Sequence, residues 1–300
     1  MEKPELSIII VNYNTKQITK KCLDEVVRSL AKTKIKYEIV MVDNDSKDSS
    51  VEMLQQYKNK LKDQLTLILS KENLGFGKGN NLGVKNAKGK YILLLNTDAF
   101  VLDEGISKLL NFYKQNDDHI HFLGPKLLNK DLTDQPSACH FYTLSVIFAV
   151  LFLKGDYWGL TRFSPNRLKR VDWISGACIL TKKKYYNQLE GFDKTIFMYM
   201  DEVDLLYRGR QRGYLTYFYP MARFIHLGSA SSGGRTFPIL QVYKGFLFFY
   251  KKHYSKYSLF WLKFMLKLKA AIAVLIGRIT QNRYLIETYE KAYQLVAMDG

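Results

Sequence analysis

The chain has 300 residues, enough for one large domain or for a core domain with an appendage; its 47% hydrophobic content is typical of a globular protein, and its 14% aromatic content is high. Its formal net charge of +17 points to an anionic partner: nucleic acid, anionic lipid or phosphorylated substrates. Cys22, Cys139 and Cys178 lie far apart without CxxC or zinc spacing, which argues against a disulfide framework and fits a reducing compartment.

The first hundred residues alternate between predicted strands and helices. The N-terminus, MEKPE, has no basic region followed by an apolar one, so we expect no signal peptide. Short apolar runs bounded by polar residues predict four buried strands: residues 6–11, 37–42, 65–69 and 91–95. Between them we expect helices at residues 15–30, 51–57 and 81–87, the last preceded by a glycine-rich turn at residues 73–80. This order predicts a parallel, doubly wound sheet.

The middle of the chain has a less regular pattern. We expect helices at residues 105–113, 182–189 and 199–212. Strands are expected at residues 171–181, with a Ser-Gly break, and at residues 216–219 and 223–226. The apolar run at residues 141–153 is too short to span a bilayer as a helix.

From about residue 237 onward the chain is helical, aromatic and basic. No Asp or Glu occurs between Leu205 and Ile286, whereas Lys and Arg are frequent there. The apolar segment 270–276 is short and bounded by basic residues, so we predict no transmembrane helix. Basic helices with Trp and Phe are typical of a membrane interface, and the alternative is a solvated face packed on the preceding domain. We find no RNP, helix-turn-helix or zinc pattern and expect no nucleic-acid partner.

Polar side chains follow the predicted strands where each one ends. They lie at residues 12–14, 43–45 and 96–98. Because the carboxyl ends of parallel strands meet at one edge of a sheet, we expect these loops and the glycine-rich turn to line one crevice. Asp98 there could hold a hard cation through oxygen. The glycine-rich turn lacks GxxxxGK[ST], and no GxGxxG follows the first strand, so neither a P-loop nor a dinucleotide fingerprint is present.

Seven ordered segments resemble an inverting GT-A glycosyltransferase of family 2, in its rhamnosyltransferase-like branch. They are residues 7–14 (SIIIVNYN), 42–46 (VDNDS), 72–83 (ENLGFGKGNNLG), 93–99 (LLLNTDA), 171–180 (VDWISGACIL), 191–208 (GFDKTIFMYMDEVDLLYR) and 226–231 (HLGSAS). The resemblance covers most of residues 5–232, and no motif covers the chain from about residue 237. It implies a GT-A (Rossmann-like), mostly parallel sheet flanked by helices, followed by the C-terminal basic aromatic helical extension.

The resemblance also implies a nucleotide-binding site and a metal site. The nucleotide-binding residues would be Val11, Asn12, Tyr13, Asn14, Asp43, Asn73, Gly75, Asn80, Asn96, Thr97 and Asp98. The family's DxD triplet falls on Asn96-Thr97-Asp98, and its last Asp binds a divalent metal, Mg²⁺ or Mn²⁺. Asn96 departs from the acidic pattern and leaves fewer charges on the metal. His226 matches a position that can complete the metal shell.

The catalytic residues are expected at the start of a helix. The family's Glu-Asp pair is replaced by Asp201-Glu202. The second member is normally the base, so we predict Glu202, with Asp201 as the close alternative because the order of the acids is swapped. Inverting transfer needs a base that removes the acceptor hydroxyl proton, and a metal that takes up charge on the departing diphosphate.

Each of these residues also has a structural interpretation. Asp43 could cap a helix, Asn12 could form a turn, and His226 could be a hydrogen-bonded structural histidine. For four further residues we expect only structural roles: core packing for Trp173 and Phe192, a turn for Asp193, and an ion pair with Arg208 for Asp204.

The sequence therefore predicts a metal-dependent inverting glycosyltransferase of cell-surface polysaccharide synthesis. It would move a sugar, L-rhamnose by resemblance, from a nucleotide-diphosphate donor to a glycan or polyprenyl-diphosphate-linked acceptor. We expect a GT-A domain over residues 1–236, with a nucleotide half (1–100) and an acceptor half (101–236). Residues 237–300 would attach the cytoplasmic enzyme to the anionic inner face of the cell membrane. The alternatives are a non-catalytic nucleotide-sugar or glycan-binding subunit and a nucleotidyltransferase.

Overall fold

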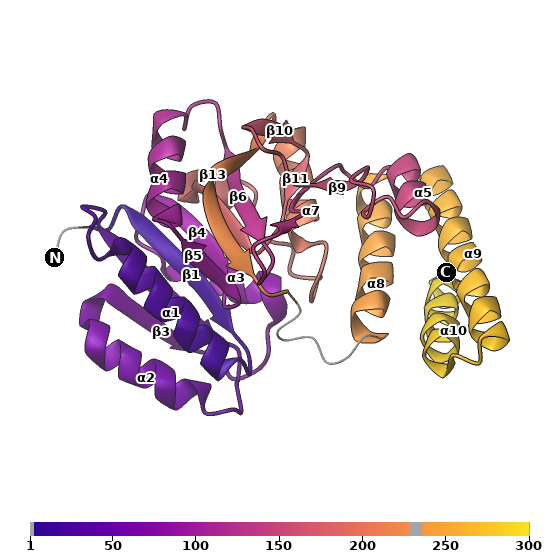
Figure 1. The fold of residues 1–300 in the computed structure, drawn as a ribbon, viewed down its shortest axis with the longest axis horizontal. Coiled ribbons are helices and arrows are strands. Elements are labelled where there is room, and N and C mark those ends of the chain that lie inside the picture. Colours follow the sequence, from indigo (N-terminus) through magenta and orange to yellow (C-terminus); the bar gives the residue numbers. More distant parts are fainter. Residues whose placement is uncertain (1–2, 229–235, 300) are drawn as a thin grey trace. The chain divides into compact units, whose positions relative to one another are not determined.

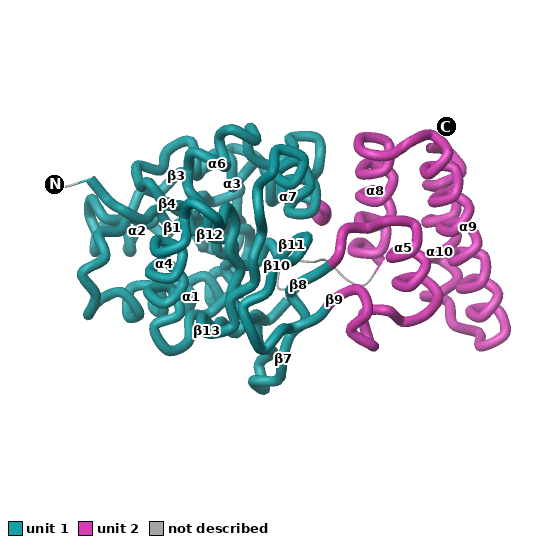
Figure 2. Tube along the Cα trace, turned by 90° about the horizontal axis from the view of Figure 1, so that it is seen from above, with its two compact units in different colours: residues 1–139, 163–197, 201–231 teal, residues 140–162, 198–200, 232–300 magenta. Residues whose placement is uncertain are grey.

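The computed structural model describes residues 3–228 and 236–299 and divides into two compact units (Figures 1 and 2). We call the first the sheet unit: Met1–Cys139, Phe163–Phe197 and Asp201–Ser231. The second is the helical unit: His140–Arg162, Met198–Met200 and Ser232–Gly300. The expected boundary between residues 236 and 237 stays a prediction. Residues 140–162, which were expected in the acceptor half, belong to the helical unit together with the C-terminal helices.

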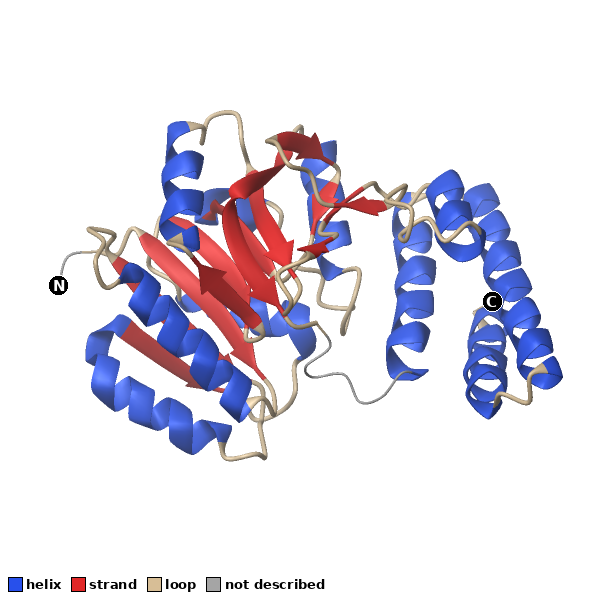
Figure 3. Ribbon diagram, viewed as in Figure 1, coloured by secondary structure: helices blue, strands red, loops and turns tan. Residues whose placement is uncertain are grey.

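The first half of the sheet unit has the predicted order of elements. They are β1 Leu6–Asn12, α1 Lys16–Leu30, β2 Tyr37–Asp43, α2 Ser50–Leu61, a 3₁₀ turn Lys62–Gln64, β3 Leu65–Leu69, α3 Gly75–Asn86 and β4 Tyr91–Asn96. The strands lie in the order β3-β2-β1-β4, all parallel, because each apolar run is covered by helices on both faces. Helices lie on both sides of this sheet (Figure 3). Ile8 and Ile10 face the core with α1, whereas Ile9 and Val11 face α3.

The glycine-rich segment is mostly helical, and the turn predicted there is wrong. We expected a turn at residues 73–80 with a helix from about residue 81, but α3 begins at Gly75. Its glycines are buried because they let the helix approach the sheet. A Cβ on Gly83 would lie 2.4 Å from Ile9 Cγ2, and one on Gly79 would lie 2.8 Å from Val11 Cγ1. The glycines here act as packing surfaces rather than as a loop.

The second half extends the same sheet with mixed pairings: β12 is antiparallel to β4 and β6, whereas β13 is parallel to β6. Its elements are β5 Ala99–Leu102, α4 Gly105–Gln115, β6 Phe122–Leu128, β7 Asp134–Gln135, β10 Lys169–Val171, β12 Cys178–Lys182, α6 Lys183–Gln188, α7 Asp201–Gln211 and β13 Thr216–His226. The sheet order is β10-β13-β6-β12-β4-β1-β2-β3, with β5 on β13 and β7 on β6. A separate small sheet contains β8 Ala138–Cys139, β9 Arg162–Phe163 and β11 Trp173–Ile174. The α/β fold is confirmed.

Three details of this half differ from the sequence patterns. β6 was not expected, because Gly124-Pro125 in its middle is a strand-breaking signal. The segment 171–181 forms parts of three strands, separated at Asp172 and at residues 175–177. The two strands expected at residues 216–219 and 223–226 form one strand, β13, with an irregular register between Tyr219 and Arg223.

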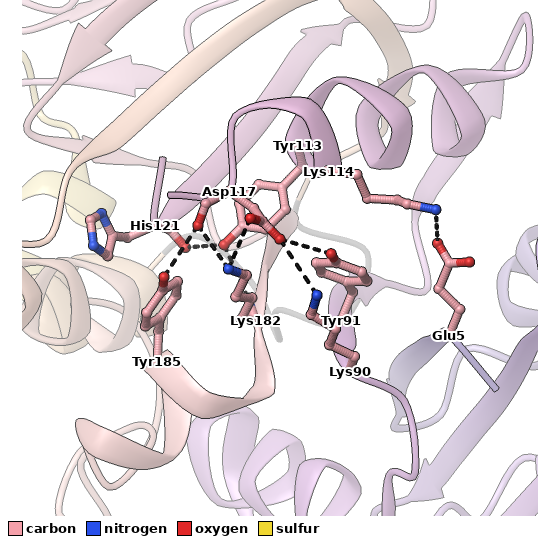
Figure 4. A network of polar contacts seen from close by, with 9 residues as sticks. All are labelled: Glu5, Lys90, Tyr91, Tyr113, Lys114, Asp117, His121, Lys182 and Tyr185. Carbon is pink, nitrogen blue, oxygen red and sulfur yellow. Dashed lines mark hydrogen bonds and ion pairs between the residues drawn. The ribbon is translucent and has the colours of Figure 1, made fainter. Parts of the chain in front are cut away.

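A network of paired charges lies at the start of β4 (Figure 4). Asp117 accepts a hydrogen bond from the Tyr91 hydroxyl (2.8 Å) and forms an ion pair with Lys182 (3.0 Å). Lys182 Nζ also donates to the main-chain oxygen of Asp117 (2.9 Å), and the Tyr185 hydroxyl donates to the same oxygen (3.2 Å). Burial alone would raise the pKa of Asp117, but the bonds from Lys182 and Tyr91 outweigh it and lower the pKa.

The helical unit consists of four helices: α5 Leu144–Phe152, α8 Thr236–His253, α9 Lys256–Ile279 and α10 Arg283–Met298. Within this unit α9 packs against α5, α8 and α10. The C-terminal helices confirm the pattern expected from about residue 237. Among residues 3–228 and 236–299, no helix is long and apolar enough to cross a membrane.

Candidate active site

The predicted site residues collect at one edge of the parallel sheet. The registers place Asn12 opposite Asp43, and Val11 opposite Asn96, so that β1, β2 and β4 end level with one another. The convergence expected from the strand pattern is therefore observed.

The side chain of Asn12 braces the first two strand-end loops. Its Nδ2 donates to Asp43 Oδ2 (2.7 Å) and Ser46 Oγ (2.9 Å), and its Oδ1 accepts from the Thr15 hydroxyl (2.9 Å) and the Thr19 hydroxyl. Asn12 is completely buried. Both donors and both acceptor positions of its amide are used within the protein, so Asn12 shapes the nucleotide-side loops from behind.

The same loops are joined at their tips. Asp43 Oδ1 accepts from the main-chain N–H of Ser46 (2.9 Å), and Asn14 Oδ1 accepts from that of Lys47 (2.6 Å). Asn14 has a φ of 51°, a left-handed value that Asn tolerates. Tyr13 is half-buried beside them. Direct contact of these residues with a nucleotide stays a prediction, and the structure adds that the loops are pre-ordered.

The glycine-rich residues are held by amide side chains. Asn73 Oδ1 accepts from the N–H of Gly75 (3.0 Å), and Asn80 Nδ2 donates to the oxygen of Phe76 (3.0 Å). Gly75 has a φ of +77°, and a Cβ there would lie 2.4 Å from the oxygen of Phe197. Only glycine fits this left-handed, crowded position without strain.

Asn44 lies in the predicted crevice loop 43–45 but was not among the predicted nucleotide-binding residues. Its Nδ2 donates to the oxygen of Gly75 (3.1 Å), which joins the end of β2 to the start of α3. Its Oδ1 is buried and has no hydrogen-bond partner among the described residues. A buried acceptor without a partner is costly, which makes it available to a ligand donor. Its place directly after Asp43 was the signal that could have found it.

The turn between β4 and β5 carries Asn96, Thr97 and Asp98. The N–H of Asn96 donates to the oxygen of Ala177 (3.0 Å), and the Thr97 hydroxyl lies 3.4 Å from that of Thr15. The Asp98 side chain is 8% exposed. Beneath the turn lies the Cys22 thiol, and burial raises its pKa so that it stays neutral beside Asp98.

Asp98 meets His226 because β5 and β13 pair. The register places His226 opposite Ala99, and the N–H of Leu227 donates to the oxygen of Asp98 (3.1 Å). His226 Nε2 lies 3.4 Å from Asp98 Oδ1. The structure thus brings together the two predicted metal ligands. The remaining residues of the predicted motif at 226–231, Ser229 to Ser231, lie outside the described residues.

This oxygen–nitrogen pair fits a divalent cation that is also bound by substrate. Adjacent ligands of an octahedral Mg²⁺ lie about 3.0 Å apart, close to the separation of the two side chains. Within the described parts of the chain, no group of three or more His, Cys, Asp or Glu side chains converges. Asp98 and His226 would supply two ligands of such a site, and Mg²⁺ in proteins is typically held by one or two carboxylates together with phosphates and water.

The two acids at the start of α7 have different environments. Asp201 is completely buried, and neither of its carboxyl oxygens has a hydrogen-bond partner in the part of the chain that the structure describes. It lies against Gly77, where a Cβ would come within 2.6 Å of Asp201 Oδ1. Burial, and then the charge of Glu202, raise the pKa of Asp201 well above its usual range, which favours the neutral form of this carboxyl.

Glu202 is half-buried and faces the turn before β12. A Cβ on Gly176 would lie 3.5 Å from Glu202 Cδ and 3.4 Å from the Phe76 ring. Gly176 directly precedes Ala177, whose oxygen accepts from Asn96. The turn at residues 175–177 therefore links the acid pair to the strand end that carries Asp98.

The structural roles expected for four neighbouring residues are confirmed. Asp204 pairs with Arg208 Nε at 2.7 Å, and Arg208 donates to the oxygen of Gly191 (2.7 Å). Asp193 accepts from the N–H of Thr195 (2.8 Å) in a turn. The other two, Trp173 and Phe192, are buried in the core.

Comparison with known sequences gives a family and several relatives. A model described as glycosyl transferase family 2 matches residues 7–173, more than half of the chain. A poly(ribitol-phosphate) beta-glucosyltransferase of Bacillus spizizenii is 35% identical over 116 residues, 39% of this chain and 18% of that protein. A low-salt glycan biosynthesis hexosyltransferase of Haloferax volcanii is 27% identical over 216 residues, 69% of this chain and 62% of that protein. This chain thus spans less than two thirds of either relative.

A third relative bears on the sugar. An N-acetylglucosaminyl-diphospho-decaprenol L-rhamnosyltransferase of Mycobacterium tuberculosis is 27% identical over 217 residues, 65% of this chain and 68% of that protein.

Two solved structures share the fold. The mannosyltransferase PcManGT from Pyrobaculum calidifontis, in complex with GDP-Man and Mn²⁺, has a TM-score of 0.60 at 14% identity, over 99% of this chain and 87% of that one. GalNAc-T7 with UDP, GalNAc and Mn²⁺ has a TM-score of 0.65 at 15% identity, over 98% of this chain and 56% of that one. The expected GT-A fold is confirmed.

Proposed function

This chain belongs to glycosyl transferase family 2, and on that premise we propose that it is a metal-dependent inverting glycosyltransferase. It would move a sugar from a nucleotide-diphosphate donor to a glycan or a polyprenyl-diphosphate-linked acceptor. The observation that carries the proposal is that two sets of polar side chains, suited to different chemical tasks, lie at one edge of the sheet. A partial cation site, Asp98 with His226, and an acid pair, Asp201 with Glu202, are joined through the turn at residues 175–177.

In this proposal Glu202 is the base. It would accept the proton of the acceptor hydroxyl while that oxygen bonds to the anomeric carbon and the diphosphate leaves. Asp201 is less suited to this step, because its carboxyl is completely buried and its raised pKa favours the neutral form, whereas Glu202 is half-buried.

The donor diphosphate would be bound beside Asp98 and His226. A divalent cation held there, Mg²⁺ or Mn²⁺, would neutralise charge on the leaving diphosphate as a Lewis acid. The presence of Mn²⁺ with a nucleotide in both solved structures supports this assignment. Asn14, Tyr13 and Asp43 lie on the loops that would bind the nucleoside, with Asn12 ordering them from behind.

L-Rhamnose is the proposed sugar, because a relative that covers 65% of this chain is named as an L-rhamnosyltransferase. The test is turnover of a panel of dTDP-rhamnose, UDP-glucose, UDP-N-acetylglucosamine and GDP-mannose with lipid-linked acceptors. Release of nucleoside diphosphate with dTDP-rhamnose is expected. Release of pyrophosphate would indicate a nucleotidyltransferase instead, and binding of a donor without turnover would indicate a non-catalytic subunit.

The helical unit supports attachment to the inner face of the cell membrane. One face of α9 is buried within the unit at Leu262, Leu266 and Ala270, and the other exposes an apolar row. That row contains Tyr257, Phe260, Trp261, Phe264, Leu268, Ile272, Leu275, Ile276 and Ile279. Because an α-helix turns by about 100° per residue, four basic residues of α9 lie beside this apolar row: Lys256, Lys263, Lys267 and Arg278. Apolar contact beside a basic row is the pattern of an interfacial helix on anionic lipid.

A second segment of the same unit extends this apolar surface. α5 has the sequence LSVIFAVLF, and of its nine residues only Ile147 is buried. The loop after it exposes Tyr157 (78%), Trp158 (68%) and Leu160 (57%). Since α5 packs on α9, both segments can contact one bilayer.

The membrane proposal is tested by vesicle sedimentation with the full chain. We expect binding to phosphatidylglycerol vesicles that falls with added salt, and loss of binding for the double change Trp158→Ser and Phe264→Ser. Leu132→Ser, an equally exposed apolar residue of the sheet unit, is the matched control (59% exposed). Absence of vesicle binding by the unaltered chain at low salt would refute the attachment.

A further inference from the structure

Gln135, in the short strand β7, holds His226 at two points. Its Nε2 donates to the main-chain oxygen of His226 (3.1 Å) and to Asn129 Oδ1 (3.1 Å). Its Oε1 lies 2.7 Å from His226 Nδ1. No sequence motif pointed to Gln135.

These contacts determine how the amide of Gln135 is oriented. A main-chain carbonyl oxygen can only accept, so the group of Gln135 that faces the His226 carbonyl must be the NH₂. The amide oxygen therefore faces the imidazole ring. Asn129 fixes the same orientation a second time. The Thr133 hydroxyl donates to Asp131 Oδ1 (2.6 Å) and therefore accepts from Asn129 Nδ2 (2.9 Å), which leaves Asn129 Oδ1 toward Gln135.

The orientation of Gln135 in turn fixes the tautomer of His226. An amide oxygen has no proton to donate, so His226 Nδ1 must carry the proton of this hydrogen bond. A neutral imidazole has one N–H, which leaves a lone pair on Nε2. That nitrogen is the atom 3.4 Å from Asp98 Oδ1.

We propose that Gln135 is a positioning residue for the divalent-cation site, holding His226 as the Nδ1–H tautomer with its Nε2 lone pair beside Asp98. This inference rests on the proposed function, because it takes Asp98 and His226 to be cation ligands. A metal-binding histidine commonly donates its second ring N–H to such a partner, and removing the partner costs about 10- to 100-fold in metal affinity.

A purely structural role for Gln135 makes a different prediction. The side chain also ties β7 to the end of β13, and its loss could disturb the site through the backbone. The backbone of Gln135 has an independent support in its pairing with Leu127 of β6. The two roles separate in a double-mutant cycle, because a residue that acts through the His226 ring loses its effect when the ring is absent.

The experiment measures the Mn²⁺ affinity of the full chain by electron paramagnetic resonance, with UDP, dTDP or GDP present. The variants are Gln135→Met, His226→Ala and the double variant, with Gln211→Met as an exposed control. We expect Gln135→Met to weaken Mn²⁺ binding about 10- to 100-fold in the unaltered background and to have no further effect in the His226→Ala background. Equal losses in both backgrounds, or no loss in the single variant, would overturn the inference.

Gln135→Glu adds a test that does not depend on the severity of the methionine change. Glutamate keeps an acceptor for the Nδ1 proton but loses both NH₂ donations. If the tautomer determines the affinity, Gln135→Glu should bind Mn²⁺ more tightly than Gln135→Met. If the hydrogen bond to the backbone determines it, the two variants should bind Mn²⁺ equally weakly.

If the unaltered chain binds no Mn²⁺ with any of the three nucleotides, the cation site of the proposed function fails together with this inference. If it binds Mn²⁺ and Gln135→Met binds equally well, only this inference fails.

Discussion

The two ends of β4 carry polar clusters of opposite kinds. At the start of the strand, Asp117 has Lys182 and Tyr91 as close partners, and its pKa is lowered (Figure 4). Beyond the other end, Asp98 lies beside His226, its one ion-pair partner among the described residues. The nearby Asp201 is buried without a hydrogen bond among the described residues, and its pKa is raised.

The difference in hydrogen-bond partners distinguishes groups that stabilise the fold from groups that are available to a ligand. A buried carboxylate with strong hydrogen bonds contributes to the free energy of unfolding, whereas a buried polar group without partners reduces it. Where the strand-end loops meet, Asn44 Oδ1 and the Asp201 carboxyl are buried groups of this second kind, without hydrogen-bond partners among the described residues. We therefore expect substitutions of Asp98 and Glu202 to change activity, and substitution of Asp117 to change stability.

The largest effect is expected for Glu202→Gln. Loss of the base should lower the transfer rate about 10²- to 10⁴-fold with little change in thermal stability. The rate is measured as nucleoside diphosphate released from the active donor, with the exposed Glu190→Gln as control. Full activity in both Glu202→Gln and Asp201→Asn would show that neither acid is the base.

Asp98→Asn should have the next largest effect. Because Asp98 would be a direct ligand, Mn²⁺ affinity in the presence of nucleotide should fall at least about 100-fold, more than for a residue that only orients a ligand. Calorimetric titration with Mn²⁺ measures the change, and the exposed Asp63→Asn is the control. An unchanged metal dependence would remove Asp98 from the cation site.

Asp117→Asn should lower the free energy of unfolding and leave transfer intact. The expected loss is about 1–3 kcal/mol, because Asp117 is a mostly buried carboxylate with charged partners. Its lowered pKa means that this stability is present above the unfolded value of about 3.9 and is lost as pH falls through the folded pKa. Urea unfolding measures it, with the neighbouring Asp118→Asn, whose side chain is 71% exposed, as control.

The smallest effect, and one of opposite sign with pH, is expected for Asp201→Asn. A raised pKa means that the contribution of Asp201 is fully present below about pH 3.9 and is lost as pH rises toward the folded pKa. The asparagine variant should therefore gain stability over the unaltered chain as pH rises, and it should keep its transfer activity. Thermal unfolding of both proteins at pH 5 and pH 8 gives the comparison. If the stability of the variant relative to the unaltered chain is lower at pH 8 than at pH 5, the raised pKa of Asp201 is contradicted.

Local patterns in the sequence were sufficient for the elements of the parallel half. The strands at residues 6–11, 37–42, 65–69 and 91–95, and the helix ending at Leu30, are found within a residue of the expected bounds. These runs encode their own structure because apolar periodicity and polar strand ends are short-range properties. The strand-end pattern identified Asp98, whereas the Asp201-Glu202 pair, at the start of a helix, was identified by the family resemblance.

Tertiary structure alone decided the environments of these groups. Asp98 lies beside His226 because β5 pairs with β13 across more than a hundred residues of chain, and Gln135 reaches His226 through β7. The burial of Asp201 depends on Gly77 in a helix that the sequence presented as a turn. By itself the sequence determined which chemical groups stand at the strand ends. Their partners, exposure and protonation follow from long-range strand pairing and helix packing, because pairing register and burial are properties of segments that meet only in the folded chain.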